Sequence, residues 1–310
     1  IRPKFWKTKN IISLLFYPLS IITYLINSFK KLSIKKKYSI KTICVGNIFI
    51  GGTGKTSLTI KIQKLLNKKF KTVFIKKKYQ NQLDEINLLK KNGEVISTHN
   101  REKALNVANK KFEIAIFDDG LQQKNIDYDI KVVCFNNDEG MGNEFMIPAG
   151  PLRESKNELK KYDIAFLNGE KKNTKLFSKL KSINKNLKIF EGKYKPKNLT
   201  NLDRNKKYLM FCGIGNPHEF EKTLIKYKFN IEYKVIYPDH YKISNYEIIK
   251  LKKKAKNEGL VLITTEKDFF RLRKKERKNI KYLEVELEIK NISKFKKIML
   301  AKLWENFFIS

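Results

Sequence analysis

The chain has 310 residues, enough for two domains with a sizeable core, and its 41% hydrophobic content excludes a largely disordered protein. Its formal charge of +36 arises from 67 lysines and arginines against 31 aspartates and glutamates, which indicates either anionic partners or a biased genomic base composition that favours lysine, asparagine and isoleucine. No zinc-finger, ribonucleoprotein or arginine-rich helix pattern accompanies this charge, and we therefore expect acidic lipids or phosphorylated molecules as partners, and no nucleic acid.

The first predicted element is an uncharged segment, residues 10–29, with lysines on both sides. Its length suits a bilayer, and Pro18 should bend or interrupt its helix. Its polar side chains would form one stripe on a helix: Ser13, Tyr17, Ser20, Tyr24 and Asn27. This stripe could face lipid headgroups or the protein body. We expect a helix lying in the membrane plane or partly inserted, with a full crossing and a helix buried in a soluble core as the alternatives.

A first domain, residues 39–195, follows the membrane-associating region 1–38. Apolar runs alternate here with amphipathic stretches, which predicts an α/β fold with a mostly parallel sheet covered on both faces. The predicted strands are 41–45, 72–75, 112–117, 130–135, 163–167 and 188–190. The predicted helices are 55–66, 85–91, 102–108 and 172–181.

A polar stretch containing Pro196 predicts a linker over residues 196–207. A second, smaller α/β domain is expected over 208–310. Its predicted strands are 208–212, 231–236, 260–264 and 281–285, and its predicted helices are 219–227, 245–257 and 292–307. The three cysteines, Cys44, Cys134 and Cys212, lie in or beside apolar strands, which predicts reduced, buried thiols.

The strongest chemical motif is a glycine-rich loop between the first predicted strand and helix. Its residues are Gly51, Gly52, Thr53, Gly54, Lys55, Thr56 and Ser57. Glycines allow backbone N–H groups to point at phosphates, and the helix N-terminus adds its dipole. Lys55 would neutralise the outer phosphates of ATP, and Thr56 would bind Mg²⁺. Phe49 stands where the usual pattern has its first glycine.

Two acids, Asp118 and Asp119, end another apolar strand of the first domain. Carboxylates there should face the glycine-rich loop at the carboxyl edge of the sheet and could hold Mg²⁺ or its water. Elsewhere, His240 follows a strand of the second domain, and Asp84 alone looks like the acidic first turn of a helix. Thr265 and Asp268 are sufficiently explained as a helix cap, although a substrate role stays open.

Taken together, these motifs resemble the tetraacyldisaccharide 4′-kinase family along nearly the whole chain. The shared segments occur in one order: Gly46-Asn47, Gly51–Thr56, Asp118–Gln122, Pro148–Glu154, Cys212–Ile214, Pro238–Tyr241 and Thr264–Asp268. The resemblance implies transfer of the γ-phosphate of ATP to the 4′-hydroxyl of a tetraacylated glucosamine disaccharide 1-phosphate, which gives lipid IVA.

The same resemblance implies roles for single residues. Asp84 would be the base and His240 its partner, Gln122 and Glu154 would act around magnesium and phosphate, and Arg153 would bind phosphate. The chain departs from the family pattern in three places: Gln123 replaces a histidine, Lys76–Gln80 replaces Ser-Arg-Gly-Tyr-Gly, and Asp84-Glu85-Ile86 replaces Asp-Glu-Pro.

The expected enzyme is a monomer on the cytoplasmic face of a Gram-negative inner membrane. Anionic lipids would attract its basic surface while the two domains close over ATP and exclude water. Two other classes are open. A partitioning-type membrane ATPase would carry a signature lysine where Ile50 stands, and a nucleic-acid-binding NTPase is favoured by net charge alone.

Overall fold

The computed structural model describes residues 3–29, 34–79, 83–239 and 241–304, without the side chains of Leu83 and Asp84. The chain forms two compact units. The larger unit comprises Arg2–Lys78, Asn92–Tyr194 and Leu287–Ser310. The smaller unit comprises Tyr79–Lys91 and Lys195–Glu286, together with Ile1.

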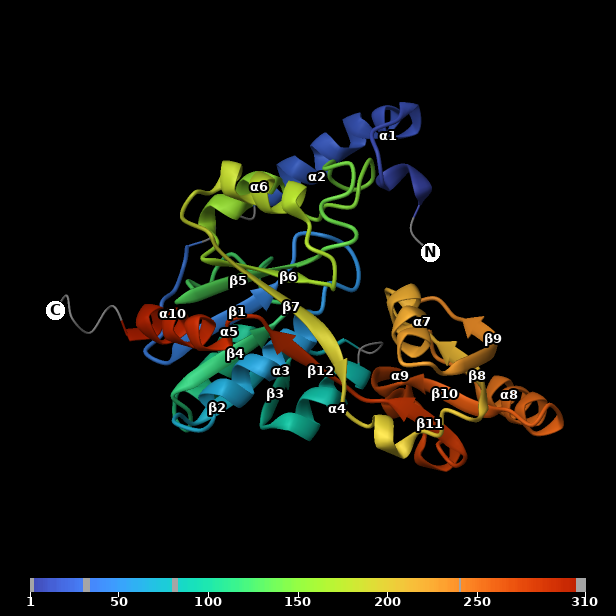
Figure 1. The fold of residues 1–310 in the computed structure, drawn as a ribbon. Helices are drawn as coiled ribbons and strands as arrows, with labels where there is room; N and C mark the ends of the chain where they lie inside the picture. The colour runs from blue at the N-terminus through green and yellow to red at the C-terminus, as the bar shows by residue number, and fades with distance from the viewer. Residues whose placement is uncertain (1–2, 30–33, 80–82, 240, 305–310) are drawn as a thin grey trace. The chain divides into compact units, whose positions relative to one another are not determined.

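An eight-stranded sheet forms the centre of the larger unit, in the order β12-β7-β6-β5-β1-β4-β2-β3 (Figure 1). Its pairs from β7 to β3 are parallel. The strands are β1 (Lys41–Gly46), β2 (Thr72–Lys77), β3 (Val95–Thr98), β4 (Ile114–Asp118), β5 (Ile130–Asn136), β6 (Ile164–Asn168), β7 (Lys188–Pro196) and β12 (Val285–Ile289). Every residue of β4 and β6 is buried, as in parallel sheets covered on both faces.

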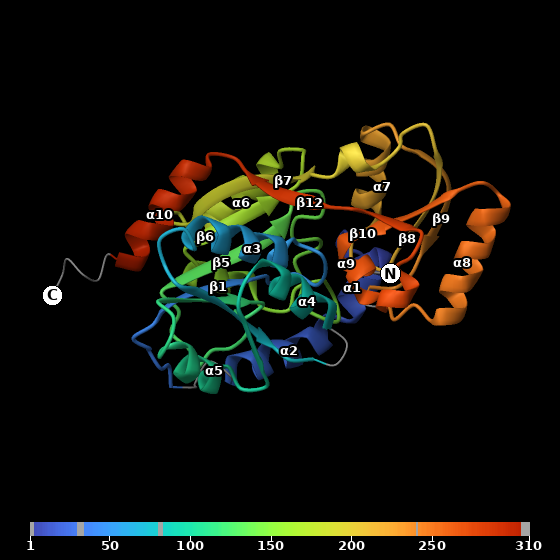
Figure 2. The same cartoon turned by 90° about the horizontal axis from the view of Figure 1, so that it is seen from below.

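Four helices of the larger unit accompany this sheet: α3 (Lys55–Leu66), α5 (Arg101–Ala108), α6 (Thr174–Ile183) and α10 (Ile292–Trp304). Helices α3 and α10 lie against the sheet (Figure 2). Leu58, Ile62 and Leu66 recur every four residues of α3 and are buried, so one face of this helix joins the core. Short 3₁₀ turns cover Lys4–Trp6, Lys156–Lys161, Leu199–Asn201 and Lys274–Glu276 along the chain.

The smaller unit has its own four-stranded parallel sheet, in the order β11-β10-β8-β9. Its strands are β8 (Lys207–Cys212), β9 (Asn230–Ile236), β10 (Val261–Thr265) and β11 (Ile280–Leu283). Its helices are α4 (Leu83–Asn92), α7 (Pro217–Lys226), α8 (Asn245–Asn257) and α9 (Glu266–Arg271). Helix α4 belongs to this unit as far as Lys91. Ser244 caps α8 in a capping box with Glu247, which explains why this helix begins where the sequence predicted.

The predicted division of the chain needs three corrections. Pro196, the first residue of the predicted linker, belongs to β7, the predicted strand 281–285 is two strands in different sheets, and β3 was not predicted. The chain also crosses between the units more often than expected. Residues 79–91 join the smaller unit, whereas β12 from Leu287 and α10 return to the larger one, because they complete the edge and face of its sheet.

At the N-terminus, α1 (Ile11–Leu15) and α2 (Tyr17–Phe29) replace the single predicted helix. The break falls at Phe16, so Pro18 stands in the first turn of α2, where its missing N–H costs no helical hydrogen bond. No helix of the described chain is both long and apolar enough to cross a bilayer.

Part of the predicted polar stripe packs on the protein, whereas its Tyr17 and Tyr24 are exposed. Ser13 and Ser20 are buried, the Ser20 hydroxyl donates to the Met146 carbonyl at 2.7 Å, and Asn27 Nδ2 donates to the Arg153 carbonyl at 2.8 Å. The apolar side is exposed, which contradicts a helix buried in a soluble core. Its most exposed side chains are Ile11, Leu15 and Phe29, at 83%, 77% and 72%.

Candidate nucleotide site

The glycine-rich loop connects β1 to α3 in the larger unit. Gly54 caps α3 with a φ of +83°, a left-handed conformation that favours glycine. A Cβ atom at Gly54 would also lie 2.8 Å from Asn168 Nδ2, so a side chain there would require Asn168 to shift. The buried side chain of Asn47 donates to Thr53 Oγ1 at 3.0 Å and to the Gly51 carbonyl at 3.3 Å. These two hydrogen bonds fix the conformation of the loop.

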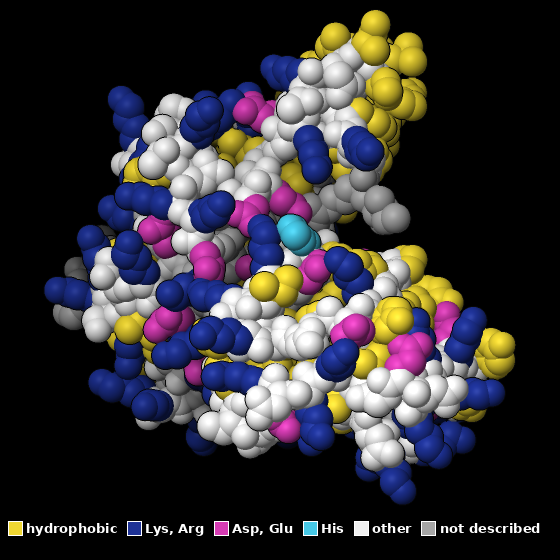
Figure 3. All heavy atoms as spheres, turned by 45° about the vertical axis from the view of Figure 1, so that its right-hand side comes forward, with side chains coloured by type: hydrophobic (Ala, Val, Ile, Leu, Met, Phe, Trp, Pro, Cys, Tyr) yellow, Lys and Arg dark blue, Asp and Glu magenta, His cyan; other side chains and the backbone are white. Residues whose placement is uncertain are grey.

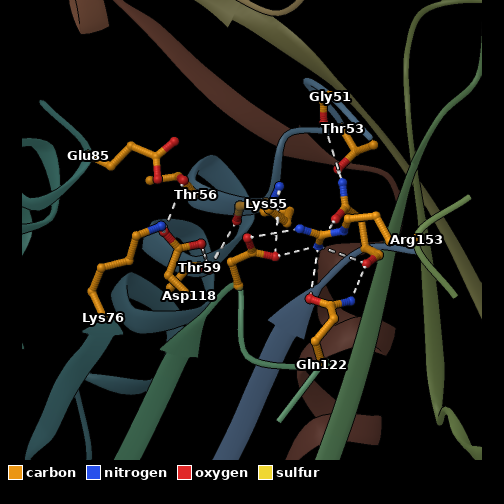
Figure 4. A network of polar contacts seen from close by, with 12 residues as sticks. Gly51, Thr53, Lys55, Thr56, Thr59, Lys76, Glu85, Asp118, Gln122 and Arg153 are labelled. Atoms are coloured by element: carbon orange, nitrogen blue, oxygen red, sulfur yellow. Dashed lines mark hydrogen bonds and ion pairs between the residues drawn. The ribbon is translucent and has the colours of Figure 1, made fainter. Parts of the chain in front are cut away.

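Asp118 is the last residue of β4, and its carboxylate is fully buried. It accepts hydrogen bonds from Thr56 Oγ1 at 3.1 Å and, more weakly, from Thr59 Oγ1 at 3.5 Å (Figure 4). Lys76 Nζ donates to the same carboxylate at 2.8 Å. The predicted meeting of an acid on β4 with the P-loop threonine is therefore present in the structure.

Asp119 follows β4 with a φ of +59° and points to different partners. Its carboxylate accepts from Arg153 Nη2 at 2.8 Å, and its Oδ1 lies 4.0 Å from Lys55 Nζ. Burial by itself would raise the pKa of Asp119, but the charges of Lys55 and Arg153 outweigh it and hold this pKa well below its usual range. Asp119 is therefore ionised at neutral pH.

Arg153 is the centre of a second network. Its Nη2 donates to Gln122 Oε1 at 3.0 Å, and Gln122 Nε2 donates to Glu154 Oε2 at 3.1 Å. Glu154 is buried and also receives Lys124 at 2.5 Å and the Tyr162 hydroxyl at 3.1 Å. Side chains of the protein thus donate to both carboxylate oxygens of Glu154. The assignment of Glu154 and Gln122 as magnesium ligands stays a prediction.

The oxygen atoms of Thr56 and Asp118 suit Mg²⁺, which takes hard oxygen ligands and is usually bound through one or two carboxylates together with substrate phosphates. Within the described residues, no group of three or more acidic, histidine or cysteine side chains could hold a metal without such help. The donor set therefore fits a magnesium ion that arrives with a nucleotide.

A cavity of about 450 Å³ opens at the carboxyl ends of β5, β6 and β12 and beside the middle of β7. Asn137, Gly169 and Glu191 are among its lining residues. Asn137 Oδ1 and the neighbouring Asn168 Oδ1 are buried without a hydrogen-bond partner in the described structure. Asn168 also approaches Gly54, so the cavity lies beside the glycine-rich loop. The hydroxyl of Tyr194, in β7, lies 3.3 Å from Ser57 Oγ, in the first turn of α3.

The two predicted acid–base residues lie outside the described side chains: His240 is not described, and only the backbone of Asp84 is, at the start of α4. Both chain segments belong to the smaller unit, whereas the sequence had placed Asp84 in the nucleotide domain. Lys267 Nζ lies 3.2 Å from Glu85 Oε1 and 4.0 Å from Asp239 Oδ1. The sequence neighbours of the two residues therefore share one lysine.

The Thr265–Asp268 segment has the capping role that the sequence indicated. Thr265 Oγ1 accepts from the Asp268 N–H at 3.1 Å, and the buried Asp268 carboxylate accepts from the Gly213 N–H at 3.0 Å and from Arg271 at 2.7 Å. Burial raises the pKa of Asp268 despite these donors. This motif thus joins the ends of β8 and β10, which sequence order alone would not predict.

Three residues of the site had no individual role predicted from the sequence. Asn47 was noted only as part of Gly46-Asn47, Lys124 stands in an ordinary polar loop, and Lys76 opens a run of three lysines that resembles a solvated surface. Their sequence context gives no sign of burial. Lys76 could be recognised only from its alignment with Asp118 across β2 and β4.

A family model described as tetraacyldisaccharide-1-P 4′-kinase (LpxK) matches residues 12–304. The tetraacyldisaccharide 4′-kinase of Pelagibacter ubique is 46% identical over 296 residues, 93% of each chain. The enzyme of the same name from Rickettsia canadensis is 36% identical over 311 residues, again 93% of each chain. Both relatives come from Gram-negative bacteria.

The fold is also that of a solved structure. The "apo" form of LpxK from Aquifex aeolicus in complex with ATP aligns with a TM-score of 0.71 at 20% identity, over 94% of this chain and 100% of that one. The likeness in fold extends over both units of the chain.

Proposed function

The chain belongs to the tetraacyldisaccharide-1-P 4′-kinase family, and from this membership we propose that it transfers the γ-phosphate of ATP to the 4′-hydroxyl of a tetraacylated glucosamine disaccharide 1-phosphate. The observation that carries the proposal is the P-loop, in which Lys55 and Thr56 begin α3 and Thr56 bonds to Asp118 at the end of β4. Family membership does not favour a partitioning-type ATPase.

Phosphoryl transfer depends mainly on positioning and on stabilising negative charge. Lys55 supplies a cation at the N-terminus of α3, whose backbone N–H groups and dipole also attract phosphate. When bound with the nucleotide, magnesium would neutralise the phosphate oxygens, held through Thr56 and Asp118. Arg153, fixed by Asp119 and Gln122, presents a second cation for a phosphate of ATP or of the acceptor.

We place the nucleoside of ATP in the cavity at the ends of β5 and β6, beside the middle of β7. Its volume of about 450 Å³ lies within the range of small-molecule sites. The buried oxygen atoms of Asn137 and Asn168 lack donors, and hydroxyl or amino groups of a nucleoside could supply them. Asn168 approaches Gly54 and precedes Gly169 of the cavity lining, so the cavity lies near the phosphate loop.

The acceptor is a lipid, and the N-terminal helices suit a membrane surface. Figure 3 shows hydrophobic side chains gathered at the end of the larger unit formed by α1 and α2. Lys4, Lys7 and Lys9 stand beside them and are exposed. We propose that this face lies in the cytoplasmic leaflet of the inner membrane and that the protein works there as a monomer, with anionic lipids attracting its basic side chains.

The function is tested by comparing transfer from radiolabelled ATP to the lipid disaccharide, to free sugar and to water. We expect transfer to the lipid alone. Lys55→Ala should abolish this transfer without changing thermal unfolding, because it removes a phosphate-binding charge and little packing. Lipid phosphorylation that persists at the wild-type rate in Lys55→Ala would exclude the P-loop as the catalytic site.

A further inference from the structure

A buried lysine lies beside the expected magnesium site. Lys76, near the end of β2, is aligned directly with Asp118 of β4. The Lys76 side chain is 2% exposed and that of Asp118 is 0% exposed, and their ion pair measures 2.8 Å. A lysine is almost never buried so completely unless it is paired, and burial of both charges requires close contact to compensate for lost hydration.

The position of this ion pair relates it directly to the P-loop. Asp118 Oδ2 accepts both from Lys76 Nζ and from Thr56 Oγ1, so one carboxylate oxygen connects the lysine to the threonine that would bind magnesium (Figure 4). Thr59 contacts the other oxygen at 3.5 Å. The direction of the Asp118 carboxylate is thus fixed before any nucleotide binds.

Lysine at this position also changes the charge of the site. Lys76 places a positive charge at the buried carboxylate of Asp118, in addition to the charges of Lys55 and Arg153 beside Asp119. A doubly charged cation that arrived alone would be repelled by the Lys76 ammonium at this buried pair, where charges interact strongly. A nucleotide phosphate chain adds negative charge and so offsets this repulsion.

We propose that Lys76 is a positioning residue that holds Asp118 against Thr56 and excludes free divalent cations, so that magnesium enters this site only together with the nucleotide. The inference rests on the proposed function of the P-loop.

The test is a calorimetric titration of the whole protein with MgCl₂ in the absence of nucleotide, with MnCl₂ followed by electron paramagnetic resonance as a second probe. The variants are Lys76→Met, which removes the charge at similar volume, and Lys76→Ser, which leaves room for water around Asp118. Lys71→Met is the matched control, because Lys71 is exposed just before β2.

We expect wild type and Lys71→Met to bind free Mg²⁺ or Mn²⁺ at least about tenfold more weakly than both Lys76 variants, because removing a nearby like charge strengthens cation binding. Added Mg²⁺ should raise the unfolding temperature of the Lys76 variants and leave wild type unchanged. If Lys76→Met does not fold, Lys76→Ser decides the question.

Equal metal affinity in wild type and a folded Lys76 variant would overturn the proposal. The binding measurement needs no lipid acceptor, so its failure is distinct from failure of the kinase function. Loss of lipid phosphorylation in the wild-type assay would reject the proposed function, whatever the metal titration gave.

Discussion

Basic side chains give the two acids after β4 different roles. Asp118 is paired with Lys76, whereas Asp119 is held by Arg153 and lies near Lys55. The lowered pKa of Asp119 makes it a weak proton acceptor, since general bases work best with a pKa near the working pH. Asp119 is therefore a poor candidate for the base that activates the acceptor hydroxyl, and Asp84 stays the prediction for that role.

The cysteines allow a direct check of the core. Cys44, Cys134 and Cys212 are all buried and free, and burial raises the pKa of Cys44 and of Cys212 to about 12. At pH 8 only about 10⁻⁴ of such a thiol is thiolate, the form that reacts. We expect the native protein to react with a thiol-specific chromogenic reagent only as fast as it unfolds, and the protein in guanidinium to release three equivalents at once. A fast equivalent from the native protein would contradict this burial.

At the level of elements, α1 and α2 reverse the usual arrangement of an amphipathic helix in a soluble protein. Their polar side meets the body through Ser13, Ser20 and Asn27, while their apolar side faces outwards. An apolar patch of this kind marks an interaction surface. Asn27 contacts the backbone of Arg153, so removing the whole segment would also disturb the nucleotide site, and point substitutions are the better test.

We expect Leu15→Glu with Ile22→Glu to weaken binding to vesicles that contain anionic lipids by at least about tenfold, because each change removes a membrane-inserting side chain worth about 1.5–3 kcal/mol. The measurement is co-sedimentation with vesicles. Ile249→Glu on α8 is the control, since Ile249 is 55% exposed and lies in the smaller unit. Transfer to a detergent-dispersed acceptor should fall less than binding does. Unchanged sedimentation of the double variant would place the membrane contact elsewhere.

In the whole molecule, each unit is built from segments that do not follow one another along the chain. Segment Tyr79–Lys91 leaves the larger unit between β2 and β3 and joins the smaller one, where Lys267 contacts Glu85 and Asp239. Asp84 and His240 are the direct sequence neighbours of these two acids. The two chain segments that carry the proposed acid–base residues therefore belong to one unit.

We expect Asp84→Ala and His240→Ala each to lower the catalytic rate by about 10²–10⁴-fold, the range for lost general-base catalysis. ATP affinity should change little, because the P-loop lies in the other unit. The double variant should be hardly slower than the slower single variant, since residues that act as a unit are not additive. The measurements are single-turnover transfer and ATP binding by calorimetry. Multiplicative losses would show independent roles, and a near-wild-type Asp84→Ala would move the base to Glu85.

Local sequence signals predicted most elements of both units. Helices 55–66 and 245–257 agree with the structure at both ends, because the glycine before α3 and the capping box of α8 fix their starts within a few residues of chain. The buried strands of the larger sheet were recognisable from their continuous apolar runs. The P-loop and the two acids at the end of β4 were also predictable, because each lies at the end of an apolar strand that the sequence itself reveals.

The sequence by itself thus determined the α/β class, the phosphate loop and the family resemblance, all of which depend on neighbours along the chain. Only the tertiary structure decided that β12 and α10 return to the larger unit and that the polar stripe of α2 faces inwards. It also decided that Lys76 is buried against Asp118. Each of these depends on which distant segment supplies the partner, because strand pairing, the packing of a helix face and the burial of a charge are set by contacts far apart in sequence.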